Sequence, residues 1–313
     1  MAAAPAAPPF VVVAIPTFRR PEQLVQLLRS LAAMHDRPDM AILIADNDDR
    51  GRGGIAAAQA LVEQGFPIPI DAFPVAEPGL CHNRNALVAR ALVHPRMTHV
   101  AMLDDDQWVD PDWIATLTRE AFAQDADIVA GPVLFEFEGE TPDWNAAIPL
   151  FRAEPHATGP VDMLFSLTNA LSTRACWEAT PAPWFDLRFN QIGGEDFDLY
   201  SRWKAQGLRF GWTTAAVVHE IVPGDRAQLP WIWRRMWRVG NTDTMVAWKH
   251  AGMGRRGWLV ARTLLMTGAA VATAPLSLRS RLARIERTGR IIRLGGRIAG
   301  LAGYGWREYA DRS

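Results

Sequence analysis

Three consecutive aspartates, Asp104, Asp105 and Asp106, follow directly on a short apolar run. The run, residues 99–103, predicts a buried strand, and Pro111 predicts the start of a helix. The aspartates would then lie at the carboxyl end of a strand, where open α/β sheets bind ligands. Adjacent carboxylates repel one another unless a cation lies among them. Because oxygen ligands suit Mg2+ or Mn2+, the cluster predicts a divalent metal site, whereas a helix N-cap would explain only one of the three.

A second acidic pair stands in the sequence GGEDFDLY, residues 193–200. Gly193 and Gly194 predict a turn, and Glu195 and Asp196 would begin a helix. A carboxylate at a helix N-terminus stays ionised, because the dipole and the N–H groups favour its charged form. The pair therefore suits a general base, although a plain helix cap would explain it equally well.

Other polar side chains stand where elements are expected to end. Residues 41–45 predict a buried strand that ends at Asp46. Gly79 frees the backbone for a turn before Arg84, which would lie where a helix begins and bind an anion there, or be a surface arginine. His219 follows an alternating apolar strand, so it is either a metal ligand or a satisfied core residue.

The elements around these residues alternate between strands and helices. Residues 10–15 and 41–45 are continuous apolar runs, which are typical of strands buried on both faces of a parallel sheet. Leucines recur at helical spacing within residues 22–34. The first strand and helix lack the G-x-G-x-x-G of a dinucleotide-binding fold. The sequence therefore predicts an α/β protein of another type.

Taken in order, these segments resemble a family 2 glycosyltransferase of the GT-A type over about residues 10–222. The resemblance depends on five landmarks, which are Ile15-Pro-Thr-Phe-Arg19, Asp46, residues 79–85, residues 103–106 with Pro111, and Gly194-Glu-Asp196. It implies a Rossmann-like mixed sheet flanked by helices and an inverting hexosyltransferase that uses a nucleotide sugar. The expected cofactor is Mg2+ or Mn2+.

The resemblance also implies roles for individual residues. Asp196 would be the general base, with Glu195 as its neighbour. The nucleotide sugar, expected to be a UDP-sugar, would be bound by Pro16, Thr17, Arg19, Asp46, Arg84, Asp104 and Asp105. Asp106 would bind the metal, and His219 would complete the metal or diphosphate shell. Contacts with the diphosphate or the acceptor would come from Arg235, Arg238 and Trp231. Asp104 and Asp106 would form the D-x-D pair, although the adjacent Asp105 leaves open which two aspartates do this work.

The Gln-x-x-Arg-Trp motif of processive synthases is absent from the chain, which favours addition of a single sugar. The implied acceptor is a hydroxyl of a saccharide or of a polyprenyl-linked saccharide. Such a reaction belongs to the assembly of bacterial exopolysaccharide or other cell-surface glycans.

The charge of the chain is unevenly divided. Residues 1–224 carry 16 Lys and Arg against 29 Asp and Glu, and residues 225–313 carry 17 against 5. Residues 279–297 place arginines among leucines and isoleucines, which predicts a helix at the interface of an anionic membrane, or an ordinary helical appendage with solvated arginines. Residues 258–278 are marginal in length for a spanning helix, and Arg262 would be costly in mid-bilayer.

These patterns predict three regions. Residues 1–9 lack the features of a signal peptide and form a disordered lead-in. Residues 10–224 form the GT-A catalytic domain, and residues 225–313 form a basic, Trp-rich helical region for acceptor or membrane contact. Two cysteines cannot make a disulfide framework, which favours a reducing compartment. The expected location is the cytoplasmic face of the inner membrane, with peripheral association.

Two other classes of function fit parts of the sequence. A metal-dependent nucleotidyltransferase also uses aspartates at strand ends, but it would carry a Gly-rich basic loop near the first strand. A nucleic-acid-binding or lipid-binding module would use the basic C-terminal region. That region has no recognisable nucleic-acid motif, so we expect no nucleic acid as a partner. The carboxylates speak against a catalytically inactive, lectin-like relative.

Overall fold

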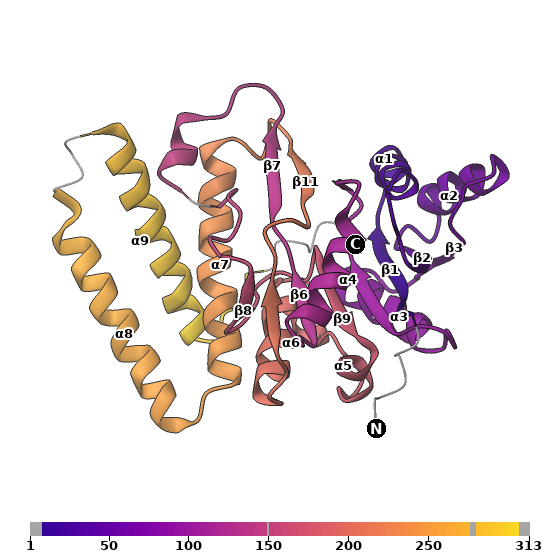
Figure 1. Ribbon diagram of the computed structural model, residues 1–313. Coiled ribbons are helices and arrows are strands. Elements are labelled where there is room, and N and C mark those ends of the chain that lie inside the picture. Colours follow the sequence, from indigo (N-terminus) through magenta and orange to yellow (C-terminus); the bar gives the residue numbers. More distant parts are fainter. Residues whose placement is uncertain (1–7, 149, 276–279, 307–313) are drawn as a thin grey trace. The chain divides into compact units, whose positions relative to one another are not determined.

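The computed structural model of the protein describes residues 8–148, 150–275 and 280–306 (Figure 1). Most of the predicted lead-in, residues 1–7, lies outside the described residues. The chain divides into two compact units. Unit 1 comprises Met1–Leu134, Ala153–Leu187 and Leu199–Glu220, and unit 2 comprises Phe135–Arg152, Arg188–Asp198 and Ile221–Ser313, each as far as it is described. The predicted domain boundary at residue 224 stays a prediction. The last segment of unit 2 begins at Ile221, and the unit also includes two earlier segments.

The main sheet of unit 1 has the strand order β3-β2-β1-β4-β9-β6-β10-β8. Its strands are β1 (Phe10–Thr17), β2 (Asp39–Asp46), β3 (Ile70–Pro74), β4 (His99–Met102), β6 (Ile128–Ala130), β8 (Gly159–Val161), β9 (Ala170–Thr173) and β10 (Phe210–Trp212). The first four strands run parallel, whereas β9 is antiparallel to β4 and β6. Every residue of β1 is buried, as its apolar run predicts.

Unit 1 contains the helices α1 (Pro21–Ala32), α2 (Gly53–Glu63), α3 (Leu80–Leu92), α4 (Trp113–Ala123) and α5 (Arg174–Glu178). Helix α6 (Glu195–Ala205) begins in unit 2 and continues into unit 1. The predicted leucine spacing in α1 is confirmed, because Leu24, Leu27, Leu28 and Leu31 are all fully buried. They join the residues of β1, β2 and α4 in one hydrophobic core.

A second sheet has the strand order β5-β11-β7. These strands are β5 (Gln107–Val109), β7 (Val133–Phe137) and β11 (Val218–Val222). The sequence interrupts residues 128–137 with Gly131 and Pro132, and the chain there passes from β6 in the main sheet to β7 in the second sheet. The second sheet begins directly after the aspartate cluster.

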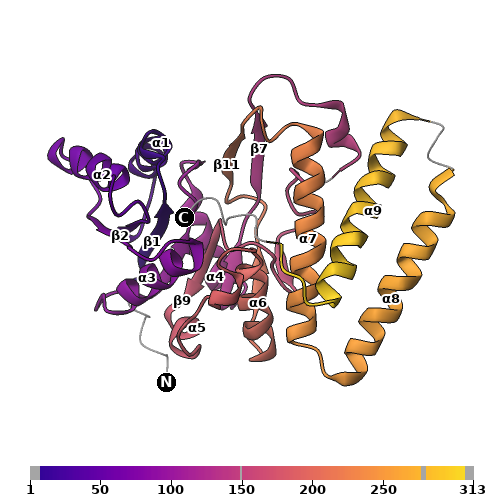
Figure 2. The same cartoon turned by 180° about the vertical axis from the view of Figure 1, so that it is seen from behind.

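Unit 2 contains three long helices, α7 (Leu229–Lys249), α8 (Met253–Ala272) and α9 (Arg281–Leu301). The short 3-10 helix η1 (Asp143–Ala146) lies in its first segment, and η2 (Leu187–Phe189) begins at the last residue of a unit 1 segment and continues into unit 2. Figures 1 and 2 agree in placing α9 between α7 and α8. Among the described residues, none of these helices combines the length and apolar character that a membrane span needs.

The apolar stripe of α9 does not lie wholly on an outer surface. Ile285 and Leu294 are buried within unit 2, whereas Leu282, Ile291 and Ile298 remain partly exposed. The buried residues Ile285 and Leu294 therefore do not face a membrane, while membrane contact by the exposed part of the stripe stays a prediction. The reason is that α9 packs against α7 through that side. Arg279, the start of the predicted segment, lies outside the described residues.

Glycines allow α7 and α9 to approach closely. A Cβ at Gly296 would lie 2.1 Å from the carbonyl oxygen of Trp237, and one at Gly240 would lie 2.0 Å from that of Arg293. Both neighbours are backbone atoms, which cannot move without shifting a helix. The sequence analysis missed this signal, although glycines at 289, 296 and 300 recur along one side of α9.

We expect Gly296→Ala to lower the free energy of unfolding by roughly 1–3 kcal/mol, because the added methyl group overpacks the contact between helices. Gly268→Ala is the matched control, since no atom lies within 4 Å of its Cβ position. It should raise the free energy of unfolding by up to about 1 kcal/mol through helix propensity. Urea denaturation of both variants measures the difference, and equal effects would contradict the packing argument.

Both cysteines are buried in unit 1, with Cys81 at 0% and Cys176 at 1% exposure. Burial raises the pKa of the Cys176 thiol to about 11. Because the thiolate is the reactive form, we expect an aromatic disulfide reagent to modify neither cysteine in the native protein at pH 8. Both should react after denaturation. Rapid modification of the native protein would show that one of these sites opens.

Candidate active site

The ends of β1, β2 and β4 meet at one edge of the main sheet. Thr17 is paired with Asp46, and Met102 is paired with Ala14, so the loops that follow these parallel strands leave the sheet together. The loop after β4 carries the three aspartates. The structure therefore confirms that the cluster lies at the carboxyl end of a buried strand.

Asp105 points into the protein. Its carboxylate accepts hydrogen bonds from the Thr17 hydroxyl at 2.8 Å and from the Phe18 N–H at 3.3 Å, and it lies 3.0 Å from Arg20. Only 5% of Asp105 is exposed. Burial raises the pKa of its carboxyl to about 6, although the nearby Arg20 opposes this shift. Asp105 thus ties the loop after β4 to the loop after β1.

Asp104 and Asp106 are the more exposed members of the cluster, with 37% and 19% of their side chains exposed. Asp106 lies 2.7 Å from Arg20, and Asp104 lies 3.2 Å from Arg84. Two arginines therefore neutralise part of the charge of the three aspartates. The exposure favours Asp104 and Asp106, rather than Asp105, as the D-x-D pair.

Arg20 is a site residue that the sequence analysis missed. One nitrogen of its guanidinium contacts both Asp105 and Asp106. Burial alone would lower the pKa of Arg20, but Asp106 and Asp105 outweigh burial and raise it. The sequence offers one signal, a pair of arginines before the proline that opens α1. Nothing in that signal distinguishes Arg20 from its neighbour Arg19, whose side chain is 67% exposed and lies 3.3 Å from Asp48.

Arg84 lies inside α3 and not at its start. The sequence predicts that a helix begins where Arg84 lies, but α3 begins at Leu80, directly after Gly79 with φ 117°. This prediction was wrong because the polar residues at 82–85 conceal the helical periodicity. Arg84 is 3% exposed, and its guanidinium lies over the ring of Phe185. Its position next to Asp104 thus comes from a buried helix side chain and not from a helix N-terminus.

Asp46 is completely buried at the end of β2. Its carboxylate accepts the backbone N–H groups of Gly54 at 2.8 Å and Ile55 at 3.2 Å, in the first turn of α2. It also accepts the N–H of Asp48 at 3.0 Å. In this arrangement Asp46 caps α2, while its predicted contact with the nucleotide base stays a prediction. Pro16, the other predicted contact at this edge, lies buried in β1.

His219 lies within β11, on the strand paired with β5. Its Nε2 atom is 3.0 Å from an oxygen of Asp110, and its ring stacks on Trp108 with centroids 5.2 Å apart. The neighbouring Gln107 accepts the N–H of Asp104 at 3.0 Å and donates to Glu220 at 3.1 Å. Gln107, which the sequence analysis also missed, thereby ties the aspartate loop to β11.

Glu195 and Asp196 open α6, as predicted, after Gly193 and Gly194 with φ 77° and 95°. Glu195 is 7% exposed, and Asp196 is half-buried. Two residues on, Asp198 is fully buried. Both acidic residues of the predicted pair thus lie in the first turn of the helix, where N–H groups favour ionised carboxylates.

Asp198 connects the first turn of α6 to the end of α7. Its Oδ1 atom lies 2.5 Å from Nζ of Lys249 and 2.8 Å from Nε2 of His250. A buried carboxylate with two partners of this kind is costly to disturb. The contact holds the segment that carries Asp196 in a fixed position within unit 2.

The remaining predicted residues lie on α7. Arg238 is 7% exposed. Trp231 stacks on Phe151 with ring centroids 5.9 Å apart, and Arg235 lies over Trp231. The structure therefore brings Thr17, Arg84 and the three aspartates together in unit 1. The other predicted residues, Glu195, Asp196, Trp231, Arg235 and Arg238, belong to unit 2.

The donor atoms of the aspartate cluster fit a hard divalent cation. Asp104 and Asp106 offer partly exposed carboxylates, whose oxygens suit Mg2+ or Mn2+. Within the described ranges, no group of three or more His, Cys, Asp or Glu side chains is arranged to hold a metal ion. An ion at this edge would therefore need ligands from a bound diphosphate and water, as Mg2+ commonly has.

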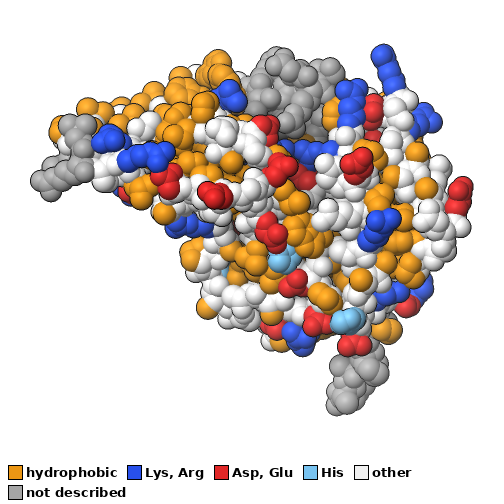
Figure 3. Space-filling model, turned by 90° about the horizontal axis from the view of Figure 1, so that it is seen from above, with side chains coloured by type: hydrophobic (Ala, Val, Ile, Leu, Met, Phe, Trp, Pro, Cys, Tyr) orange, Lys and Arg blue, Asp and Glu red, His pale blue; other side chains and the backbone are white. Residues whose placement is uncertain are grey.

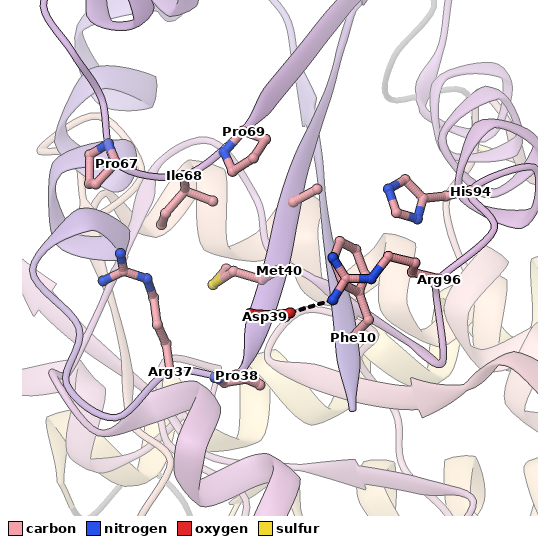
Figure 4. A pocket seen from close by; sticks show the side chains of 11 residues that line it. Phe10, Arg37, Pro38, Asp39, Met40, Pro67, Ile68, Pro69, His94 and Arg96 are labelled. Atoms are coloured by element: carbon pink, nitrogen blue, oxygen red, sulfur yellow. Dashed lines mark hydrogen bonds and ion pairs between the residues drawn. The ribbon is translucent and has the colours of Figure 1, made fainter. Parts of the chain in front are cut away.

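A hollow of about 580 Å3 lies at the opposite, amino end of β1 and β2, lined by Phe10, Asp39, Met40, His94, Arg96 and neighbouring residues (Figure 4). Its volume is in the range of small-molecule sites. Arg96 is paired with Asp39 there and lies over the Phe10 ring. The lining offers no cluster of carboxylates, and the aspartate edge remains the candidate active site.

The mixed sheet and its flanking helices are those of the GT-A type, and sequence comparison agrees. The family model described as "Glycosyl transferase family 2" matches residues 12–178, and one described as "Glycosyl transferase family group 2" matches residues 99–287. The succinoglycan biosynthesis protein ExoM of Rhizobium meliloti (strain 1021) is 31% identical over 311 residues, which cover 95% of this chain and 96% of the relative. The chain belongs to glycosyltransferase family 2.

Solved structures support the fold. The mannosyltransferase PcManGT from Pyrobaculum calidifontis, in complex with GDP-Man and Mn2+, aligns with a TM-score of 0.61 at 16% identity, covering 94% of this chain and 87% of that one. S. aureus TarS 1-349 in complex with UDP aligns with a TM-score of 0.50 at 12% identity, covering 96% and 93%. The predicted α/β sheet of the GT-A type is confirmed, and family membership decides against a nucleotidyltransferase.

Proposed function

We propose that this enzyme transfers one sugar residue from a UDP-sugar, with inversion of configuration, to a hydroxyl of a saccharide or polyprenyl-linked saccharide in bacterial exopolysaccharide assembly. The observation that carries the proposal is the half-buried pair Asp104 and Asp106 beside Arg84 and Arg20 at the carboxyl edge of the sheet. The relative ExoM is named a succinoglycan biosynthesis protein, and this name supports a role in exopolysaccharide assembly. The UDP complex of TarS supports the choice of base.

The reaction has two difficulties, a weak nucleophile and an anionic leaving group. The acceptor oxygen attacks the anomeric carbon as the bond from that carbon to the β-phosphate oxygen breaks. Asp196, in the first turn of α6, takes the hydroxyl proton. A single displacement inverts the configuration, so an α-linked donor gives a β-glycoside.

The leaving diphosphate gains negative charge during this step. Arg84 is held in α3 next to Asp104, which suits it to contact the nucleotide phosphates. A bound Mg2+ or Mn2+ would be held by Asp106 and Asp104 and would neutralise charge on the β-phosphate. His219 would complete the diphosphate shell, and Arg235, Arg238 and Trp231 would contact the acceptor side.

A membrane location fits an acceptor that is carried on a polyprenyl lipid. The enzyme would associate peripherally with the cytoplasmic face of the inner membrane through its basic C-terminal region. The excess of 17 Lys and Arg over 5 Asp and Glu in residues 225–313 supports this contact. The family assignment and the absence of a nucleic-acid motif favour a saccharide acceptor over nucleic acid.

A thermal-shift screen of UDP and GDP, each with and without Mn2+, tests the proposed donor. A ligand that binds the native state raises the melting temperature by mass action, by the equivalent of about 2.7 kcal/mol at 100 times its Kd. UDP with Mn2+ should give the largest shift. A larger shift with GDP would overturn the assignment of the base, and no shift with either nucleotide would overturn the proposed donor site.

A further inference from the structure

The outer side of α8 carries an exposed apolar surface. Its exposed members are Leu264 at 59%, Leu265 at 74%, Met266 at 39% and Val271 at 58%. The side toward α9 holds the buried residues Thr263 and Ala270. Figure 3 shows hydrophobic side chains gathered over this pair of helices with Lys and Arg among them. Single exposed apolar residues are common on proteins, but a continuous group on one helix indicates an interaction surface.

The charges on α8 are divided along its length. The second half of the helix, residues 263–272, contains no charged residue. Arg255, Arg256 and Arg262 all lie in the first half, and the whole helix contains no acidic residue. At 1.5 Å per residue the uncharged half is about 15 Å long. It is too short to cross a hydrocarbon core of about 30 Å, but long enough to lie in one leaflet.

The neighbouring helix supplies more positive charge. The sequence of α9 contains six arginines and one acidic residue, Glu286. Three of the arginines are paired with carboxylates, Arg281 with Asp143, Arg290 with Glu286 and Arg293 with Asp243. Arg287 donates a hydrogen bond to Thr273, directly after α8 ends. The apolar half of α8 is thus accompanied by arginines from α9. This combination complements an anionic lipid surface, where apolar side chains enter the acyl boundary and arginines meet the head groups.

We propose that the outer face of α8, centred on Leu264, Leu265 and Val271, is the surface that inserts into an anionic lipid leaflet, with the arginines of α8 and α9 at the head groups. This assigns the membrane contact to α8 and not to the apolar stripe of α9, of which Ile285 and Leu294 are buried. The proposal deepens the proposed function, and it rests on that function only for the lipid-linked acceptor that the contact would serve.

Vesicle sedimentation tests this surface. The full-length protein is mixed at 150 mM salt with vesicles of phosphatidylglycerol and phosphatidylcholine, or of phosphatidylcholine alone. The test variant is L264E/L265E. The control is V62E/V93E, which makes the same charge change at apolar residues that are 50% and 76% exposed in unit 1. Because all four side chains are exposed, both variants should keep the melting temperature of the wild type.

The wild type and V62E/V93E should bind the anionic vesicles, and L264E/L265E should lose at least tenfold in partition coefficient. Equal binding by the two variants would overturn the assignment to α8. A second chain is the other occupant that would cover such a face, so sedimentation velocity without lipid completes the test. A dimer of the wild type that L264E/L265E abolishes would assign the face to self-association instead.

Because both native cysteines are buried, Val271→Cys offers a single site for an environment-sensitive fluorophore. Its emission should increase on addition of anionic vesicles and be quenched by spin-labelled lipids, while a label at Val93→Cys stays unchanged. An unchanged label at residue 271 would contradict insertion. The thermal shift with UDP and Mn2+ should be the same in L264E/L265E as in the wild type, so failure of the donor site and failure of the membrane surface are separate results.

Discussion

Replacing Asp196 with asparagine is expected to lower kcat by about 100- to 10,000-fold, the usual contribution of a positioned general base. Asparagine has nearly the same shape, but it cannot accept the proton of the acceptor hydroxyl. Asp196 is half-buried in the first turn of α6. The substitution should leave the binding of UDP and Mn2+ nearly unchanged, because the aspartate edge lies on other elements. Initial rates and thermal shifts of the same preparation measure both properties.

Asp198 provides the control that separates chemistry from structure. It is fully buried and contacts Lys249 and His250. Asp198→Asn should therefore lower the melting temperature, because it leaves the half-buried ammonium group of Lys249 without its charged partner. Asp196→Asn should not. If Asp196→Asn retained the wild-type kcat, or if its loss of activity followed a loss of stability, Asp196 would not be the base.

The sequence predicts elements best where one local signal decides. The continuous apolar run of β1 leaves no face for water, so a strand buried on both faces is the consistent solution. The glycine pair before α6 likewise marks a turn that residues with a Cβ rarely adopt. In both cases the residues that determine the structure are neighbours in the chain, and the predictions for the strand and for the helix start are confirmed.

The partners of the aspartates depend on contacts between distant residues. Arg20 and Asp105 are 85 residues apart, and no periodicity relates them. Asp105 is the aspartate that points inward, and it does so toward the hydroxyl of Thr17. Strand propensity places Thr17 in the core but does not show that its hydroxyl has this partner. For the same reason the sequence alone does not show which apolar residues of α9 are buried and which are exposed. The sequence of an apolar stripe is the same whether helix α7 or a lipid covers it. The close contact of Gly296 with α7 is the observation that distinguishes these two environments.

Replacing Asp106 with asparagine should have the second largest effect on turnover. The amide removes the charged oxygen that would bind the metal, and neutralisation of the leaving group contributes several kcal/mol, or about 100- to 1,000-fold in rate. The fold should tolerate the change, because the Asp106 side chain is 19% exposed and Arg20 keeps its contact with Asp105. The variant should therefore need a much higher Mn2+ concentration for any given rate.

Asp105→Asn is the matched control in the same loop. Its side chain points inward to Thr17 and Phe18, and an amide oxygen can accept both hydrogen bonds. Arg20 keeps its contact with Asp106 in this variant. Titration of the rate with Mn2+ should then show at least a tenfold weaker apparent affinity in Asp106→Asn and little change in Asp105→Asn. The reverse order would assign the metal to the inward aspartate, and equal Mn2+ dependence in all three proteins would remove the metal from this loop.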